Sequence, residues 1–349
     1  MVDAISPSVL NLTVFQSNIS AFSEQGPHER RPDVSVVIVS WNVRDHLVRC
    51  VRSLHSERVQ GGLGVEIIVV DNHSTDGSVH AVRPFPSVKI IEMGHNAGYG
   101  RAANAGFEVA RGRYLMVLNP DTVMHEGSLE ALVQFADTHL RAGIVAPRLL
   151  NPDGSVQVSA FRFPTLAMAF LDLFPLPSFI PGRVRLWVYR SWINGRYPTE
   201  AVATRPFRID HPLGACMLIN RRAYEQVGGF DPALFMYSEE IELALRYRKR
   251  GWECWQVPQA KVTHYGGQST KQLPDEMFLE LWRSRLYLYR KYYPRAYRVA
   301  LALMLAVSQI GQILTTKLRA ATGSIAPNQA SRLLRRARTA LRLAKTALT

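Results

Sequence analysis

Uninterrupted apolar runs alternate with amphipathic segments over the first part of the chain. Four runs rich in β-branched and aliphatic residues predict strands, and the first and the fourth are expected to be buried. Helical spacing after these runs predicts helices, among them one ending near Ala110. Such alternation predicts an α/β fold with a mostly parallel central sheet and helices on both faces. The expected strands are residues 34–40, 65–70, 88–92 and 114–118, and further helices are expected at residues 45–55 and 128–140.

The regular alternation breaks from about Ile144 onward. Residues 160–207 are rich in proline and aromatic side chains and predict an insertion over one end of the sheet. Beyond the insertion, the pattern predicts a further strand, two helices and two extended pieces. These elements are expected at residues 214–219, 221–227, 238–250, 252–257 and 261–264.

Asp121 follows the fourth expected strand directly, within Asn119-Pro120-Asp121-Thr122. Open α/β sheets bind ligands at the carboxyl ends of their strands. A hard divalent cation needs oxygen ligands and shares them readily with phosphates. Asp121 therefore predicts a metal site that neutralises a diphosphate leaving group. The alternative is a Pro-Asp turn that only closes the strand.

Two other polar segments follow expected strands. Asp71 ends the second strand, where its carboxylate is placed to accept a hydrogen bond from a nucleotide base, although a capped strand-to-helix turn is the alternative. Residues 96–106 open a helix with small side chains and Arg101, a composition that lets backbone approach phosphates. Gly106 is expected instead to allow tight packing of helix on sheet. The segment is not a GxGxxG motif after a first strand, which disfavours a nicotinamide dehydrogenase.

Paired carboxylates, Glu239 and Glu240, stand at the start of the helix expected at residues 238–250. The helix dipole alone favours acids there, but two acids after an aromatic run also suit a general base that reaches into a cleft. Glu242 and Arg246 form an i,i+4 pair that is expected to be structural. His264 is a candidate metal ligand, with a packed strand residue as the alternative.

The order of these motifs resembles glycosyltransferase family 2, inverting enzymes with the GT-A fold, and especially its bacterial rhamnosyltransferase-like members. The resemblance covers about residues 33–270 and is jointly specific, although each segment alone is weak. The segments that carry it are residues 36–42, 70–77, 96–100, 119–121, 228–231 and 239–240, together with His264.

This resemblance implies a role for each matching residue. Asp71 is expected to contact the base of the donor, Asp121 to hold Mg²⁺ or Mn²⁺ against the diphosphate with help from His264, and Glu240 to act as the catalytic base. Glu239 is the alternative base. The other expected donor-binding residues are Ser40, Asn42, Asn96, Gly98, Arg101 and Asn119.

Two departures from the family pattern bear on these roles. The metal motif reads Asn-Pro-Asp rather than Asp-x-Asp, so one carboxylate is missing and the metal is expected to be held mainly by phosphate and water. The base is Glu rather than Asp, one methylene longer, which affects its reach and its assignment relative to Glu239.

The net charge of +14 belongs entirely to the C-terminal part of the chain. Residues 281–349 hold fourteen Lys or Arg and no Asp or Glu, while the first 280 residues hold the other 28 bases and all 28 acids. Such a tail predicts contact with an anionic surface. A membrane is favoured over nucleic acid, because no nucleic-acid recognition module accompanies the basic run. Three cysteines without metal-ligand spacing favour a reducing compartment.

Two segments of the tail suit a membrane surface. Residues 299–314 are apolar but shorter than a spanning helix, which favours an interfacial or core-packed helix over a span. Residues 331–348 predict a basic amphipathic helix in an anionic leaflet, with a solvated helix docked on the catalytic domain as the alternative. Its apolar positions are Leu334, Ala337, Leu341, Ala344 and Leu348, opposite Arg335, Arg338, Arg342 and Lys345.

Together, these features predict a disordered leader (residues 1–32, not a signal peptide), a catalytic domain (33–270) and a basic helical membrane-associating extension (271–349). We expect an inverting glycosyltransferase that moves a sugar, rhamnose by resemblance, from a nucleotide diphosphate sugar to a lipid-linked saccharide of the cell envelope. It is expected in the cytoplasm, peripherally bound to the inner face of the membrane. The rivals are a nucleotide-sugar pyrophosphorylase, disfavoured by the sequence of residues 40–45, and a non-catalytic membrane-associated protein on a degenerate scaffold.

Overall fold

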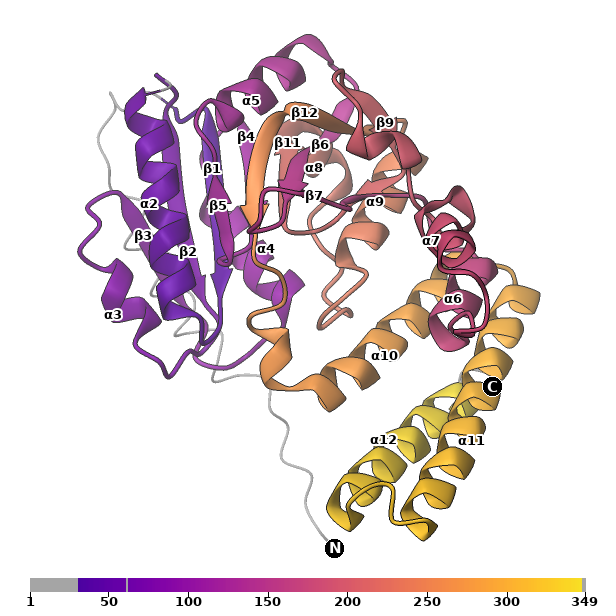
Figure 1. The fold of residues 1–349 in the computed structure, drawn as a ribbon. Helices are drawn as coiled ribbons and strands as arrows, with labels where there is room; N and C mark the ends of the chain where they lie inside the picture. Colours follow the sequence, from indigo (N-terminus) through magenta and orange to yellow (C-terminus); the bar gives the residue numbers. More distant parts are fainter. Residues whose placement is uncertain (1–30, 61, 347–349) are drawn as a thin grey trace, which may run out of the picture.

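The computed structural model describes residues 31–60 and 62–346, so the predicted leader, apart from its last two residues, lies outside the described part (Figure 1). Four parallel strands form the first half of the central sheet, in the order β3-β2-β1-β4. These are β1 (Val34–Ser40), β2 (Val65–Asp71), β3 (Val88–Glu92) and β4 (Tyr114–Leu118). All residues of β1, β2 and β4 are buried, as was expected of β1 and β4.

Helices cover both faces of this sheet. On one face, α2 (Arg44–Gln60) and α5 (Ser128–Thr138) pack against Val34, Val36 and Ile38 of β1. On the other face, α4 (Tyr99–Val109) packs against Val37 and Val39, because successive side chains of a strand point to opposite faces. A Cβ at Gly106 of α4 would clash with Val37 and Val70, so this glycine allows the close helix–sheet contact expected of it.

The second half of the sheet is mixed. Strand β11 (Cys216–Asn220) runs antiparallel between β4 and β6 (Ala142–Leu150). Strand β12 (Glu253–His264) runs parallel to β6, and β5 (Thr122–Met124) pairs antiparallel with its end. The expected break of the pattern at Ile144 was wrong, because β6 is a nine-residue strand. The two extended pieces expected after residue 252 form the single strand β12, with a register shift between Val257 and Lys261.

The insertion lies at one end of the sheet, beside the C-terminal helices (Figure 1). It contains two helices, α6 (Leu166–Leu173) and α7 (Gly182–Arg190). Short elements within and next to the insertion are β7 (Val156–Gln157), β8 (Ala160–Phe161), η1 (Trp192–Asn194), η2 (Pro198–Ala201), β9 (Phe207–Ile209) and β10 (His211–Pro212). Two other short elements lie elsewhere, α3 (Ser78–Val82) between β2 and β3, and η3 (Thr270–Gln272) after β12.

Helices α8 (Arg221–Val227) and α9 (Glu239–Lys249) return to the sheet, and three long helices follow. These are α10 (Pro274–Tyr292), α11 (Arg295–Ala321) and α12 (Pro327–Thr346). The apolar segment expected at residues 299–314 therefore lies within a 27-residue helix. Within the described part of the chain, α11 is the one helix long and apolar enough to cross a membrane, and 28% of its most apolar window is buried.

Helix α12 packs side by side with α11 and also touches α10 (Figure 1). Ala337 and Ala344 are buried in these contacts, and Leu334 and Leu341 are half-buried. In this arrangement the apolar face of α12 is not free for a lipid leaflet, because it faces other helices. Helix α12 is docked, but on α10 and α11 of the extension rather than on the catalytic domain as the alternative prediction had it, while Arg335, Arg338 and Arg342 stay exposed.

Candidate functional site

Asp71 and Ser40 lie side by side at the carboxyl edge of the parallel strands, where β2 and β1 pair in register. Both side chains are buried. Asp71 Oδ2 accepts a hydrogen bond from the Ser74 backbone N–H at 2.9 Å. The other oxygen, Oδ1, and Ser40 Oγ have no hydrogen-bond partner within the described part of the chain. Buried polar atoms are normally paired, so this edge is prepared for a ligand that offers hydrogen bonds.

Asn42 organises the loops around that edge. It has a positive φ of 51°, which favours Asn among non-glycine residues. Its Oδ1 accepts the Thr75 N–H at 2.8 Å, and its carbonyl accepts from Gln272 Nε2 at 2.9 Å. Asn42 therefore joins the ends of β1 and β2 to the segment after β12, and it lines a cavity of about 460 Å³ beside them.

The segment at residues 96–101 is fixed by a residue that sequence reasoning missed. Asn72 donates to Asn96 Oδ1 at 2.8 Å, and its own Oδ1 accepts the Ala97 N–H at 2.9 Å. Gly98 has a φ of 85°, and a Cβ there would clash with the backbone of Phe235. Arg101, which was predicted to bind the donor phosphates together with the small residues of this segment, donates from Nε to the Pro232 carbonyl at 2.8 Å. In this arrangement, the Nε of Arg101 anchors the loop before α9.

Asp121, between β4 and β5, lies next to His264 at the end of β12. Asp121 Oδ1 lies 3.4 Å from His264 Nε2, and both side chains are at most 8% exposed. Pairing of β5 with β12 brings them together, since Thr122 is in register with His264. The Asp121 carbonyl also accepts the Tyr265 N–H at 2.9 Å. The two residues predicted as metal ligands are therefore neighbours.

Gln157, which sequence reasoning did not single out, determines the orientation of the His264 ring. Its Oε1 lies 2.7 Å from His264 Nδ1, while its amide nitrogen donates to Asn151 Oδ1 at 2.9 Å and to the His264 carbonyl at 3.2 Å. Because the amide oxygen only accepts, Nδ1 must carry a proton, which leaves the Nε2 lone pair of a neutral ring free.

This arrangement fits a divalent cation. The Nε2 atom of His264 is buried and has no hydrogen-bond partner among the described residues. It lies 3.4 Å from the Asp121 carboxylate. A histidine whose other nitrogen is held by an amide is the usual form of a metal ligand. No group of three or more His, Cys, Asp or Glu side chains gathers for a metal in the described residues. Two protein ligands suit a metal whose remaining positions are filled by phosphate oxygens and water.

Glu239 and Glu240 begin α9 after an unusual backbone segment. Tyr237 and Ser238 have φ values of 70° and 68°, a left-handed conformation that is uncommon outside glycine and often found at functional sites. This turn places both glutamates in the first turn of the helix, where free backbone N–H groups favour anions.

The two carboxylates face different surroundings. Glu240 lines a cavity of about 210 Å³, whereas Glu239 is 4% exposed and lies close to Gly100 of α4. Burial raises the pKa of both carboxyls, and repulsion from Glu240 raises the pKa of Glu239 further. A raised pKa makes a carboxylate a stronger base, as general base catalysis requires.

A short backbone segment connects the base region to the metal region. The Ala215 carbonyl accepts the Asn119 N–H at 2.8 Å, and the side chain of Glu240 lies against Gly214. Tyr99 donates from its hydroxyl to the Gly214 carbonyl at 3.2 Å. Burial, together with the charges of Glu239, Glu240 and Asp121, raises the pKa of Tyr99 well above its ordinary value. The charges of the predicted base and of the predicted metal ligand therefore both act on one tyrosine.

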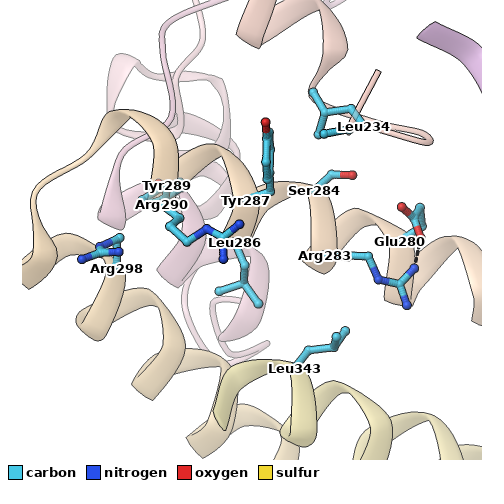
Figure 2. Close-up of a pocket in the computed structure, with 11 residues that line it drawn as sticks. Leu234, Glu280, Arg283, Ser284, Leu286, Tyr287, Tyr289, Arg290, Arg298 and Leu343 are labelled. Carbon is cyan, nitrogen blue, oxygen red and sulfur yellow. Dashed lines mark hydrogen bonds and ion pairs between the residues drawn. The ribbon is translucent and has the colours of Figure 1, made fainter. Parts of the chain in front are cut away.

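A separate cavity of about 310 Å³ lies among α10, α11 and α12 (Figure 2). Arg283, Arg290 and Arg298 line it, and Arg283 pairs with Glu280. None of the predicted site residues lines this cavity, so it is distinct from the site described above.

Several known proteins are similar to this chain in sequence or in fold. Residues 35–228 match the family described as Glycosyl transferase family 2. N-acetylglucosaminyl-diphospho-decaprenol L-rhamnosyltransferases from two strains of Mycobacterium tuberculosis are each 34% identical over 253 residues, covering 68% of this chain and 78% of the relative. A low-salt glycan biosynthesis hexosyltransferase of Haloferax volcanii is 26% identical, covering 66% of this chain and 67% of that protein. Among solved structures, a mannosyltransferase from Pyrobaculum calidifontis in complex with GDP-Man and Mn²⁺ aligns with a TM-score of 0.51 and 16% identity, covering 97% of this chain and 94% of that one.

Proposed function

Because the chain belongs to glycosyltransferase family 2, we propose that it moves a rhamnosyl unit from a nucleotide diphosphate sugar to a lipid-linked saccharide, with inversion at the anomeric carbon. Membership of the family, the enzyme class and the GT-A fold confirm what the sequence predicts. The observation that carries the choice of substrates is the 34% identity to rhamnosyltransferases over 78% of their length. The family match gives no support to a pyrophosphorylase or a degenerate scaffold.

In the proposed reaction, Glu240 takes the proton of an acceptor hydroxyl, and the oxygen attacks the anomeric carbon of the donor sugar. The bond from that carbon to the diphosphate breaks, and the nucleoside diphosphate leaves with the electron pair. Access to a cavity supports Glu240 as the base, because the more deeply buried Glu239 faces α4. The raised pKa of Glu240 is consistent with this task.

At the donor side, Asp71 and Ser40 are proposed to bind the nucleotide through their unpaired oxygens. Asp121 and His264 are proposed to hold Mg²⁺ or Mn²⁺. When bound, such a cation neutralises charge on the departing diphosphate. Asn119 fixes the turn that presents Asp121, through its N–H and through its carbonyl, which accepts from Thr122 Oγ1 at 2.6 Å.

We also propose that the enzyme lies on the inner face of the cell membrane through α11. Five large aliphatic side chains, each between 47% and 66% exposed, recur at helical spacing on one side of this helix. The opposite side, with Leu301 and Leu305, is buried against other helices. A helix that is packed along one side and apolar on the other suits a position in the membrane interface. The exposed residues are Leu303, Val307, Ile310, Leu314 and Leu318.

Charge supports the same surface. The exposed arginines of α12 lie on the helix packed beside α11, and residues 281–349 contain no acid. Each basic residue near an anionic leaflet contributes about 1 kcal/mol of attraction. The basic helix thus contributes its charge, while α11 contributes the apolar contact.

The experiment that tests the proposed function is a transfer assay with the full-length chain. The purified protein is incubated with a polyprenyl diphosphate N-acetylglucosamine acceptor, Mg²⁺ or Mn²⁺, and a panel of nucleotide diphosphate sugars. We expect release of nucleoside diphosphate together with a product heavier by one deoxyhexose. Transfer of a sugar other than a deoxyhexose would change the proposed donor. If no donor in the panel alters the acceptor, the proposed function is refuted.

A further inference from the structure

The cavity in front of Glu240 is built from three distant parts of the chain. Its volume is about 210 Å³, smaller than the roughly 300–1,000 Å³ of most ligand pockets, so it suits one part of a larger ligand, such as a sugar with the phosphate groups next to it. Phe161 and Arg196 come from the insertion, His211 from β10, and Arg285 and Leu301 from α10 and α11. The C-terminal helices therefore form part of the wall that faces the base.

Arg196 is the unusual member of this wall. Its guanidinium lies over the ring of Phe161, at 4.4 Å from the ring centroid. Its side chain makes no ion pair or hydrogen bond to any other residue described in the structure. Burial lowers the pKa of Arg196, which shows that the cation is partly removed from water. A desolvated charge without a partner is costly, so such a cation is expected where an anion binds.

The two carboxylates that attract Arg196 are already engaged elsewhere. Asp172 pairs with Arg285 at 2.7 Å. Glu200 is buried and accepts from Ser159 Oγ at 2.7 Å and from Gln256 Nε2 at 2.8 Å. Arg285 therefore neutralises Asp172, whereas Glu200, whose hydrogen bonds come from neutral groups, keeps its charge and attracts Arg196 without contacting it.

Two aromatic rings form the part of the wall next to Arg196. Charged side chains also line the cavity, namely those of Asp172, Arg285 and Glu240. His211 stacks on Phe161 with 5.4 Å between ring centroids and an interplanar angle of 15°. Burial lowers the pKa of His211 to about 4, so its ring is neutral at physiological pH. The row Arg196–Phe161–His211 offers an aromatic surface with a guanidinium at one end. A guanidinium presents parallel N–H donors that match the oxygens of a phosphate.

We propose that Arg196 binds the diphosphate of the lipid-linked acceptor and so positions the acceptor sugar in front of Glu240. The position of the acceptor rests on the proposed function, since Glu240 must reach a hydroxyl of that sugar. The diphosphate lies at the opposite end of the sugar from the hydroxyl, beside the guanidinium. Leu301 belongs to α11, so the cavity borders the buried side of the helix whose other side is proposed to touch the bilayer.

A binding experiment tests this assignment without turnover. The full-length protein is titrated by calorimetry with geranyl diphosphate, geranyl monophosphate and geraniol in the same detergent. We expect the wild-type protein to prefer the diphosphate, and Arg196→Ala to weaken diphosphate binding at least tenfold without changing geraniol binding. Arg196→Lys keeps the charge but loses the planar donors, so its affinity for geranyl diphosphate should fall between those of the wild type and Arg196→Ala. Arg183→Ala, which removes an exposed arginine of α7 outside the cavity, is the matched control.

Two further titrations separate the acceptor diphosphate from other anions. Binding of free nucleoside diphosphate should be equal in wild type and Arg196→Ala, because the donor site lies at Asp71 and Asp121. Inorganic pyrophosphate without a prenyl chain distinguishes a general anion site, since equal affinity for it and for geranyl diphosphate would overturn the acceptor assignment. A loss of nucleoside diphosphate affinity in Arg196→Ala would assign Arg196 to the donor instead.

Kinetics provides the second readout. Arg196→Ala should raise the KM for a polyprenyl diphosphate acceptor at least tenfold, leave the donor KM unchanged, and not affect transfer to an alkyl N-acetylglucosaminide that lacks phosphate. An equal effect on both acceptors would refute a diphosphate contact. If the alanine variant fails to fold, two measurements still test the diphosphate contact: the affinity of Arg196→Lys for geranyl diphosphate, and the preference of the wild type among the three geranyl compounds. Absence of transfer by the wild-type protein would refute the proposed function, whereas wild-type kinetics in Arg196→Ala would refute this inference alone.

Discussion

Replacement of Glu240 by Gln removes the proposed base while keeping the size and shape of the side chain. A positioned general base contributes about 10² to 10⁴-fold to a rate, which equals roughly 3 to 5 kcal/mol of the barrier. We therefore expect Glu240→Gln to lower kcat by this factor. Donor affinity should stay unchanged, because none of the proposed donor-binding residues lines the cavity that Glu240 faces. Initial rates of nucleoside diphosphate release, with a separate donor titration, measure both quantities.

The same variant should be more stable than the wild type at neutral pH. Burial raises the pKa of Glu240, so the folded state favours the protonated carboxyl more than the unfolded chain does. The folded state consequently loses stability as pH rises from the unfolded pKa, about 4.3, through the raised folded pKa. Gln does not ionise and avoids this loss. Thermal unfolding of Glu240→Gln should show a higher Tm at neutral pH, and the difference should vanish below about pH 4.

The pH profile of the wild type follows from the same shift. A base must be deprotonated, so kcat/KM should fall on the acid side at a pH above the ordinary range of a glutamate. Glu239→Gln is the matched control, because it removes the adjacent acid but leaves the cavity-facing one. It should keep most of the turnover and move the acid limb to lower pH, since two neighbouring carboxylates raise each other's pKa. Near-normal turnover in Glu240→Gln, with loss in Glu239→Gln, would assign the base to Glu239.

Three other substitutions test separate parts of the structure. Gln157→Leu should weaken Mn²⁺ binding about 10 to 100-fold by calorimetry, because His264 loses the partner that fixes its ring, and unchanged affinity would contradict that role. Val307→Glu should reduce co-sedimentation with anionic vesicles and leave turnover of a phosphate-free soluble acceptor intact; full vesicle binding would show that this face of α11 does not touch lipid. Gly106→Ala should cost about 1 to 3 kcal/mol in urea unfolding, since its methyl group meets Val37, and a wild-type midpoint would mean that the helix shifts freely.

The parallel half of the fold could be predicted because local sequence determines it. Strands β1, β2, β3 and β4 are short runs rich in β-branched and aliphatic residues, and the structure has them within one residue of the prediction. Strand β6 was missed because Gly143 and Pro147 interrupt its apolar pattern. Its place is fixed instead by pairing with β11 and β12, distant segments whose register no local pattern reveals.

The candidate site shows the same division. Asp71, Asp121 and Glu240 stand at element ends that the sequence reveals, so their types and positions could be chosen in advance. The structure brings Asp121 to His264, but only through the pairing of β5 with β12. Gln157 lies on the two-residue strand β7, too short to give a signal. The amides that hold a site together recur throughout a sequence, and only tertiary contacts distinguish those that matter.

The basic extension is more than a tether, because ion pairs fix it to the helix that carries the base. Glu242, two residues after Glu240 on α9, is fully buried and accepts from Lys291 Nζ at 2.8 Å and Tyr292 Oη at 2.6 Å on α10. Lys291 also donates to Asp231 at 2.6 Å. Lys291 is 35% exposed and Glu242 also pairs with Arg246 at 2.8 Å, so these contacts stabilise less than a fully buried pair does, but they connect α10 directly to α9. Since α11 follows α10 after two residues, the proposed membrane surface is held at one distance from the base. Asp231, which belongs to one of the segments that resemble the family, contacts Lys291 and Tyr287 of α10, and we propose that it helps to position the acceptor side of the enzyme.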